Sequence, residues 1–228
     1  MHKSSRPQFG SIRVKTPLAF RGERIGVMGG SFNPPHAGHA TVSQTALKRL
    51  GLSRIWWVVT PGNPLKANGG LPDLGERMDA CRTLARRPRE VVTGFEAELG
   101  TTYTAATLAF LRLRHRGVRF VWVMGADNLA GFHRWQQWGT IARLMPMAIV
   151  DRPGWRWKAL ASPAARRFAA SRLPERRVGS LGRKAIGSLG KRGGAGWSLV
   201  STRLSDLSST DLRSRGLGVA RPDEQSRD

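Results

Sequence analysis

The stretch IGVMGGSFNPPHAGHA, residues 25–40, decides how the chain begins to fold. Residues 25–28 form a short apolar run that stops at two glycines, and apolar residues then recur at helical spacing between residues 38 and 50. A buried strand that leads through a glycine turn into a helix is the first half of a βαβ unit. We therefore expect parallel strands connected by helices.

The same alternation continues along the chain. The expected strands are 25–28, 55–59, 91–93, 118–124, 147–151 and 197–202, and the expected helices are 38–50, 73–86, 104–114 and 136–144. This order predicts an α/β fold, a Rossmann-like doubly wound parallel sheet with helices on both faces, in which ligands bind beyond the carboxyl ends of the strands. A length of 228 residues suits a single domain.

The chain is strongly basic, with 38 lysines and arginines against 15 acids and a formal net charge of +23. Such a surface attracts polyanions such as nucleotides or RNA. The one cysteine, Cys81, has no intramolecular partner for a disulfide, and the sequence has no long apolar run of the membrane-spanning or signal type. We expect a cytoplasmic protein with no membrane segment.

Two segments depart from the alternating pattern. Residues 1–22 carry basic residues and no acid, which predicts a poorly ordered leader before a domain at 23–228; a transit peptide has a similar composition. Residues 155–196 contain eleven basic residues and one acid, and GSLGRK is followed by the near copy GSLGKR. Their glycine and serine content argues against a packed core element and predicts a basic loop at about 175–196, either simply solvated or able to attract phosphates or RNA.

The glycines and histidines of the first stretch indicate a phosphate site. Gly29 and Gly30 let backbone amides approach an anion, and His36 and His39 fall near the first turn of the helix with both rings on one face. The start of a helix favours phosphate through its free amides and its dipole. Zinc ligation by the two histidines is an alternative, but no further ligand set is evident, and a purely structural role is another.

A second constellation, SSTDLR at residues 208–213, offers a helix cap and an arginine one turn later. Alone it is a common helix start. Together with the histidine motif it suggests that two helix N-termini from opposite ends of the chain hold one polyphosphate.

GGSFNPPHAGH together with SSTDLR resembles the nucleotidyltransferase superfamily, with its (H/T)xGH and SSTxxR signatures, and within it the bacterial nicotinate-nucleotide adenylyltransferases. The resemblance covers about residues 24–215. Further motifs of that family follow in order: Pro61-Gly-Asn-Pro-Leu-Lys66, Thr102-Tyr-Thr104, Gly125-Ala-Asp127, Trp135 and Asp151-Arg-Pro-Gly154.

The resemblance implies transfer of AMP from ATP to nicotinate mononucleotide, which gives nicotinate adenine dinucleotide and pyrophosphate in NAD biosynthesis. The mononucleotide phosphate attacks the α-phosphorus in line, without a covalent enzyme intermediate, so the protein positions two polyanions and offsets their charge. Mg²⁺ is expected to accompany ATP. The residues implied to supply positive charge for catalysis are His36, His39, Lys66 and Arg213.

The same resemblance implies two sets of binding residues. The set for ATP is Gly30, Ser31, Phe32, His36, His39, Ser209, Thr210 and Arg213. The set for the second substrate is Asn33, Thr104, Asp127, Trp135 and Arg152. Among these, Trp135 is expected to stack on the pyridine ring, Thr104 to bind its carboxylate and Asp127 to hold a ribose hydroxyl. An ordinary place in an amphipathic helix for Trp135 and a helix cap for Asp127 are the alternatives.

Several rival functions share parts of this pattern. Phosphopantetheine adenylyltransferases typically have threonine where this chain has His36 and lack the spacing from Asp127 to Trp135. A relative that prefers nicotinamide mononucleotide is not separated by these motifs. Class I aminoacyl-tRNA synthetases are usually longer and carry a lysine-rich motif that is not found here. An RNA-binding protein on the same fold is the non-enzyme alternative, suggested by the charge and the basic loop.

Overall fold

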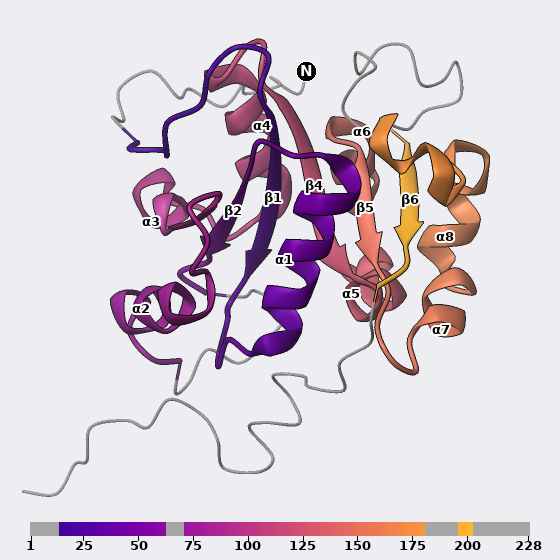
Figure 1. Ribbon diagram of the computed structural model, residues 1–228, viewed down its shortest axis with the longest axis horizontal. Coiled ribbons are helices and arrows are strands. Elements are labelled where there is room, and N and C mark those ends of the chain that lie inside the picture. The colour runs from indigo at the N-terminus through magenta and orange to yellow at the C-terminus, as the bar shows by residue number, and fades with distance from the viewer. Residues whose placement is uncertain (1–13, 63–70, 181–195, 203–228) are drawn as a thin grey trace, which may run out of the picture.

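The computed structural model describes residues 14–62, 71–180 and 196–202. Within these ranges a six-stranded sheet has the order β3-β2-β1-β4-β5-β6, and every neighbouring pair is parallel (Figure 1). The strands are β1 (Arg24–Gly30), β2 (Arg54–Val59), β3 (Glu90–Thr93), β4 (Arg119–Gly125), β5 (Met147–Val150) and β6 (Trp197–Val200). The predicted doubly wound α/β sheet is confirmed.

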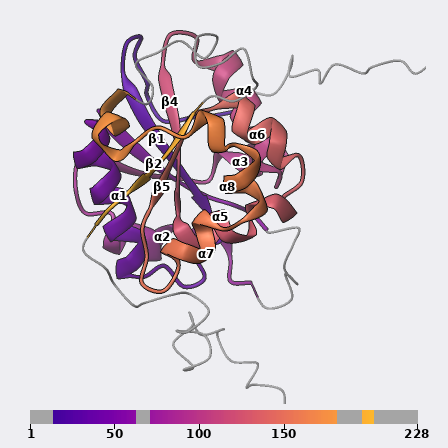
Figure 2. The ribbon, with the colours of Figure 1, turned by 90° about the vertical axis from the view of Figure 1, so that its right-hand side faces the viewer.

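Helices cover both faces of the sheet and form two hydrophobic clusters with it (Figure 2). One face carries α1 (Ala37–Leu50) and α2 (Leu74–Leu84). The other carries α3 (Phe95–Leu99), α4 (Thr104–Arg114), α5 (Ala126–Gly131), α6 (Trp138–Leu144), α7 (Arg156–Leu160) and α8 (Pro163–Arg167). Short 3₁₀ turns are η1 (Phe132–Arg134), η2 (Ala169–Ser171) and η3 (Glu175–Ser180).

The strands are nearly continuous apolar runs because both of their faces are buried. In β2 the neighbouring side chains Trp56 and Trp57 are both fully buried, and they belong to the clusters on opposite faces. Between β1 and β4 the strand order reverses direction, since β2 and β3 follow on one side and β4 to β6 on the other. A crevice for ligands is expected at the carboxyl ends of strands on either side of such a switch point.

The prediction of a poorly ordered leader is wrong for residues 14–22. Val14 is 5% exposed and belongs to the core cluster beneath α4. The backbone N–H of Lys15 donates to Glu98 Oε2 at 2.7 Å, and that of Gly22 donates to the Gly117 carbonyl at 2.9 Å. The apolar side chains of Val14 and Ala19, which pack on the same core cluster, and these backbone hydrogen bonds hold the segment, although its composition is basic. Residues 1–13 lie outside the described part of the chain.

The prediction that residues 155–196 lack a packed core element is wrong for their first part. Helices α7 and α8 fall in this region, and Ala159, Ala164 and Ala165 are buried in the core cluster that also contains residues of α5. The small alanine side chains let these short helices pack closely against their neighbours. The basic residues around the alanines hide this apolar pattern in the sequence. Glu175, at the start of η3, accepts hydrogen bonds from Ser201 and Arg49 and thereby contacts β6 and α1. Residues 181–195 are not described.

Candidate active site

Strands β1 and β4 end at the lower edge of the sheet in Figure 1. Residues at and just after these strand ends line a pocket. It is the crevice expected from the strand order. Residues of both substrate sets inferred from the sequence line it together: Gly30, Ser31, Phe32, His36, His39, Thr104, Asp127, Trp135 and Arg152.

The start of α1 forms one wall and is capped by two histidines. His36 is the N-cap residue, and its Nδ1 accepts the N–H of Gly38 at 3.1 Å. In return, Nδ1 of His39 accepts the backbone N–H of His36 at 3.2 Å, so the two side chains form a reciprocal capping box. Their ring centroids are 3.9 Å apart. The histidine spacing therefore has a structural function as well as a position in the pocket.

These hydrogen bonds determine which ring nitrogen carries the proton. Because each Nδ1 accepts a backbone N–H, the neutral form of each ring carries its hydrogen on Nε2. Burial, and to a lesser extent Arg152, lowers the pKa of His36 to about 4. Burial, then His36 and Arg152, lower the pKa of His39 well below its ordinary value.

Both imidazoles are consequently neutral near pH 7 without ligand. That His36 and His39 supply positive charge to bound phosphates therefore stays a prediction for the substrate-bound state; without ligand, the two rings lie 3.9 Å apart beside the Arg152 guanidinium, which disfavours a charge on either. What each presents instead is an Nε2–H donor. A neutral donor at a helix N-terminus still favours an anion, since the free amides and the dipole act in the same direction.

Glycine is required at two positions of this wall. A side chain at Gly38 would meet the His36 ring at 2.8 Å and the Arg152 guanidinium at 3.0 Å. A side chain at Gly29 would meet the Trp122 ring at 2.6 Å. Both glycines thus permit the close approach of groups that line the pocket.

The loop of residues 31–36 between β1 and α1 holds an unusual backbone conformation. Phe32 has a φ of 46°, in the left-handed region that residues other than glycine rarely adopt. Its buried ring stacks on Trp57 with centroids 5.4 Å apart and meets the edge of the His39 ring at 4.9 Å. The loop conformation and the orientation of His39 are therefore coupled through one aromatic ring.

The opposite wall follows β4 and contains an ion pair. Asp127, in the first turn of α5, accepts a hydrogen bond from Arg152 at 3.2 Å through Oδ2, and the Arg152 side chain is 11% exposed. The other carboxylate oxygen, Oδ1, is buried and has no hydrogen-bond partner among the described residues. An unpaired buried acceptor is costly unless a ligand satisfies it. Asp127 is thus prepared to accept a hydrogen bond from a bound hydroxyl.

Aromatic side chains and the start of α4 complete the pocket. Trp135 is half-buried and makes edge contacts with Trp122 and Phe132, at centroid distances of 6.4 and 5.4 Å. These contacts fix its ring while one side faces the pocket. Thr104 is the first residue of α4, whose N-cap, Tyr103, makes no side-chain capping bond. This helix start therefore has free amides that suit a carboxylate.

Comparison with known proteins agrees with this geometry. Residues 27–215 match the family model described as "Cytidylyltransferase-like". Relatives from Cereibacter sphaeroides and Rhizobium meliloti, each named "Probable nicotinate-nucleotide adenylyltransferase", are 50% and 52% identical over 84% and 85% of this chain and 97% and 99% of their own. The chain belongs to the nicotinate-nucleotide adenylyltransferase family.

Solved structures support the fold. Nicotinic acid mononucleotide adenylyltransferase from Plasmodium falciparum, complexed with NaAD, aligns with a TM-score of 0.60 at 15% identity over 84% of this chain and 83% of its own. The same enzyme complexed with APC gives 0.59. At this identity the likeness concerns the fold alone, and the six-stranded α/β architecture is shared.

Some residues inferred from the family resemblance are not brought into the pocket that the described residues form. Asn33 is half-buried in the 31–36 loop but does not line the pocket. Lys66, Ser209, Thr210 and Arg213 lie outside the described residues, so their positions stay predictions. In the described part of the chain, no group of three histidine, cysteine or acidic side chains could hold a metal ion.

Two buried charged residues at the pocket of this adenylyltransferase-family chain were missed by the sequence analysis. Arg77 of α2 is 1% exposed, and Glu96 of α3 is 6% exposed. Arg77 could have been noticed, because it lies three residues after Leu74 and four before Cys81, on the apolar stripe of its helix. Glu96 gave no such signal, since a five-residue helix has too few positions to reveal a buried face.

Glu96 lines the pocket as a buried carboxyl group. It accepts a hydrogen bond from the Thr107 hydroxyl at 2.6 Å, and Thr60 also contacts it. Burial raises the pKa of Glu96, while these two hydroxyls oppose the rise. Its neutral form is favoured compared with an exposed glutamate, which reduces repulsion of an anionic ligand.

Proposed function

We propose that the protein transfers AMP from ATP to nicotinate mononucleotide, giving nicotinate adenine dinucleotide and pyrophosphate in NAD biosynthesis. The names of relatives that share about half of its residues support this activity. The observation that carries it is the pocket itself: a histidine-capped helix start faces an unpaired carboxylate oxygen and an aromatic wall across the crevice between β1 and β4. We expect the reaction to take place in the cytoplasm.

The ATP phosphates are proposed to bind at the start of α1 and the 31–36 loop. Backbone amides there, including those of Gly30 and Ser31, and the Nε2–H groups of His36 and His39 give a set of donors without a fixed negative charge. Such donors are worth most where water is excluded. The proposal extends to Lys66, Ser209, Thr210 and Arg213, which belong to the family motifs.

The mononucleotide is proposed to bind on the opposite wall. Stacking of a flat ring on Trp135 contributes about 1–3 kcal/mol. The free amides at Thr104 suit the pyridine carboxylate, and Oδ1 of Asp127 suits a ribose hydroxyl. Arg152 and Asn33 complete the proposed set, with Arg152 close enough to α1 to offset phosphate charge from both substrates.

The reaction that these groups support is a direct displacement. An oxygen of the mononucleotide phosphate forms a bond to the α-phosphorus of ATP, and the bond from that phosphorus to the bridging oxygen breaks, so that pyrophosphate leaves with its electrons. The protein forms no covalent bond. The imidazole Nε2–H groups donate to non-bridging oxygens as their charge increases, and neither histidine is needed as a base because the attacking phosphate is already an anion.

Mg²⁺ is proposed to arrive on the ATP phosphates. Mg²⁺ in nucleotide sites typically keeps waters and uses substrate phosphates as ligands rather than a cage of protein side chains. The role of the chain's own residues is then to bind and orient the two phosphate groups.

One assay tests the proposed function. Purified protein is incubated with ATP, Mg²⁺ and, in turn, nicotinate mononucleotide, nicotinamide mononucleotide or phosphopantetheine, and pyrophosphate release is measured. We expect the highest kcat/KM with nicotinate mononucleotide. Faster turnover of another acceptor would reassign the substrate, and turnover of none would refute the enzyme assignment.

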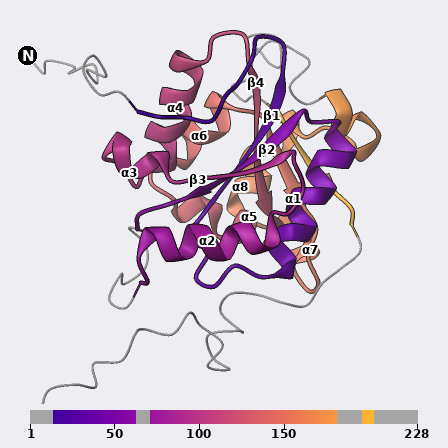
Figure 3. The ribbon, with the colours of Figure 1, turned by 60° about the vertical axis from the view of Figure 1, so that its left-hand side comes forward.

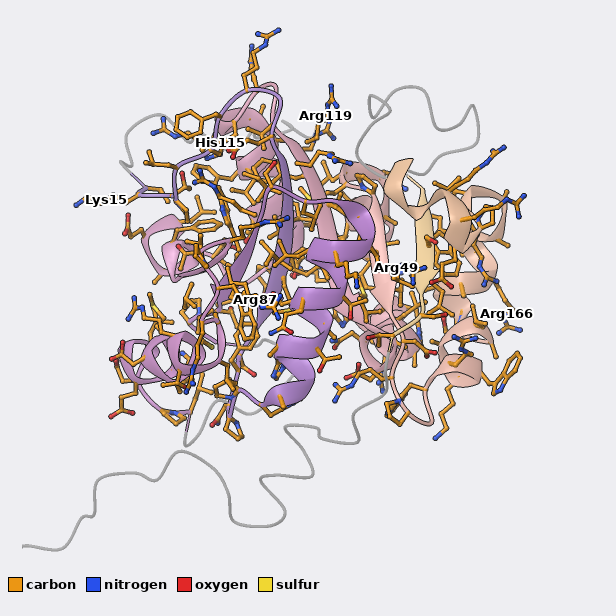
Figure 4. All side chains as sticks on the ribbon, in the orientation of Figure 1. Lys15, Arg49, Arg87, His115, Arg119 and Arg166 are labelled. Atoms are coloured by element: carbon orange, nitrogen blue, oxygen red, sulfur yellow. The ribbon has the colours of Figure 1, made fainter. Side chains whose placement is uncertain are left out.

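The net charge of +23 also favours a second candidate, RNA binding through the basic loop at about 175–196. Figure 4 shows basic side chains such as Arg119 and Arg166 projecting from different sides of the molecule. A charge spread in this way attracts polyanions without defining one groove. Deletion of residues 181–195 should remove salt-sensitive RNA binding if that loop is responsible; wild-type protein without such binding would exclude the candidate.

No helix in the described part of the chain is long and apolar enough to cross a membrane.

A further inference from the structure

A buried arginine, Arg77, belongs to α2, the helix that Figure 3 brings toward the viewer. Arg77 is 1% exposed, and none of the ion pairs among the described residues includes it. Its hydrogen bonds to other described residues all go to backbone carbonyls. Burying a cation is expensive, and an apolar side chain of similar size would often serve stability equally well. A buried arginine here therefore requires an explanation other than packing.

The carbonyls that Arg77 binds belong to two neighbouring strand ends. Its Nη1 donates to the Ser31 carbonyl and to the Thr60 carbonyl, both at 2.8 Å, and its Nε donates to Pro72 at 2.9 Å. Ser31 and Thr60 both line the pocket. The Thr60 N–H also donates to Gly30 at 3.0 Å. The guanidinium thus joins the points where the chain leaves β1 and β2.

The residue after Ser31 explains why this attachment matters. Phe32 has a left-handed backbone conformation, which persists only where its surroundings hold it. The Phe32 ring is held by stacking on Trp57. The peptide group between Ser31 and Phe32 is held by the hydrogen bond from Arg77 to the Ser31 carbonyl. The same ring contacts His39. A shift of the Ser31 carbonyl would therefore alter both the loop amides and the His39 ring.

We propose that Arg77 is a positioning residue that holds the 31–36 loop in the conformation that binds the ATP phosphates. It acts through the Ser31 carbonyl and Phe32, and makes no contact with substrate itself. Three donors in a rigid planar fork can meet three carbonyls in fixed directions, which an ammonium group on a flexible stem does less well. Its positive charge, behind the loop, also favours an anion on the far side. The inference rests on the proposed function for the identity of the ligand.

The test compares Arg77→Met and Arg77→Lys with the wild type. Arg77→Met removes every donor, so the loop is no longer held at the Ser31 carbonyl. We expect KM for ATP to rise about tenfold, which corresponds to the loss of about one charge-assisted hydrogen bond between the loop and the ATP phosphates. We also expect a lower kcat, because the His39 ring would shift with Phe32. Arg77→Lys keeps the buried charge but loses the fork, so its KM for ATP should fall between the two. Amide hydrogen exchange of residues 29–39, measured without ligand, should be faster in both variants than in the wild type.

Arg89→Gln is the matched control. Arg89 also donates to backbone carbonyls, those of Leu52 and Ser53, but at the edge of the sheet where strands begin. It should change stability without altering KM for ATP or exchange in 29–39. If Arg77→Met does not fold, Arg77→Lys decides the question. Unchanged amide exchange and unchanged KM for ATP in the folded Arg77 variants would overturn the inference. A wild-type protein that is inactive with nicotinate mononucleotide would instead overturn the proposed function. In that case the exchange of residues 29–39 alone would test whether Arg77 holds the loop.

Discussion

His39→Ala should separate the two functions of the histidine motif. The ring has a structural function, because its Nδ1 accepts the His36 backbone N–H at 3.2 Å, and it offers an Nε2–H in the pocket. Loss of a helix-capping side chain costs about 0.5–2 kcal/mol of unfolding free energy. Loss of one donor to the developing charge of a transition state costs roughly 10²–10³ in kcat. The catalytic effect should therefore exceed the structural one.

Ser162→Ala provides a control for the capping loss. Ser162 is the N-cap of α8, and its Oγ accepts the Ala165 N–H at 3.2 Å, but it does not line the pocket. Its loss should lower the free energy of unfolding by about 1 kcal/mol, as His39→Ala does, while kcat stays at the wild-type value. Pyrophosphate release at saturating substrates measures kcat, and urea unfolding measures stability. Near-normal kcat in His39→Ala, or an equal loss in Ser162→Ala, would refute the assigned role.

Two further predictions concern His36 and Trp135. The pKa of His36 is about 4 in the native protein and 6.5 in the unfolded chain. The neutral ring therefore contributes about 3 kcal/mol to the free energy of unfolding above pH 6.5, and this contribution is lost as the pH falls toward 4. His36→Asn keeps a good N-cap that does not titrate, and urea unfolding should show a smaller loss of stability between pH 7 and pH 4 than in the wild type; an identical loss would exclude His36 as the source. Trp135→Ala should raise KM for nicotinate mononucleotide by roughly 5–150-fold, the equivalent of about 1–3 kcal/mol of stacking, with little change in KM for ATP. Equal changes in both KM values would indicate a general loss of pocket structure.

The sheet could be predicted because its strands are buried on both faces. A nearly continuous apolar run such as RFVWVMG in β4 is typical of a strand buried on both faces of a parallel sheet. The glycine turn after β1 indicated the start of a helix. Short helices were harder. Helix α5, with six residues, and α3, with five, are fixed by the strand ends before them and by packing, and so they lack a detectable period. Val14 was missed because one apolar contact leaves no pattern in a basic segment.

The site could be located from sequence, but its charges could not. The spacing of His36 and His39 predicted that both rings lie on one face near the first turn of the helix, and in the structure the N-cap His36 and His39 in the first turn of α1 have ring centroids 3.9 Å apart. Their neutrality depends on burial and on Arg152, which lies more than a hundred residues later in the chain. Arg77 likewise acts through carbonyl groups, which every residue possesses, so no motif marks its partners. Long-range contacts of this kind appear only once the chain is folded.

The distribution of charge in the pocket follows from what it must bind. A site crowded with cations would hold two polyanions tightly in the ground state, and uniform binding of that kind does not raise kcat. Of the described cations, Arg152 lines the pocket but is paired with Asp127, and Arg77 lies behind the loop, while the neutral rings of His36 and His39 line the pocket. Such donors gain strength only as negative charge increases on the transferring group. The neutral histidines thus suit a reaction whose product, pyrophosphate, must also leave.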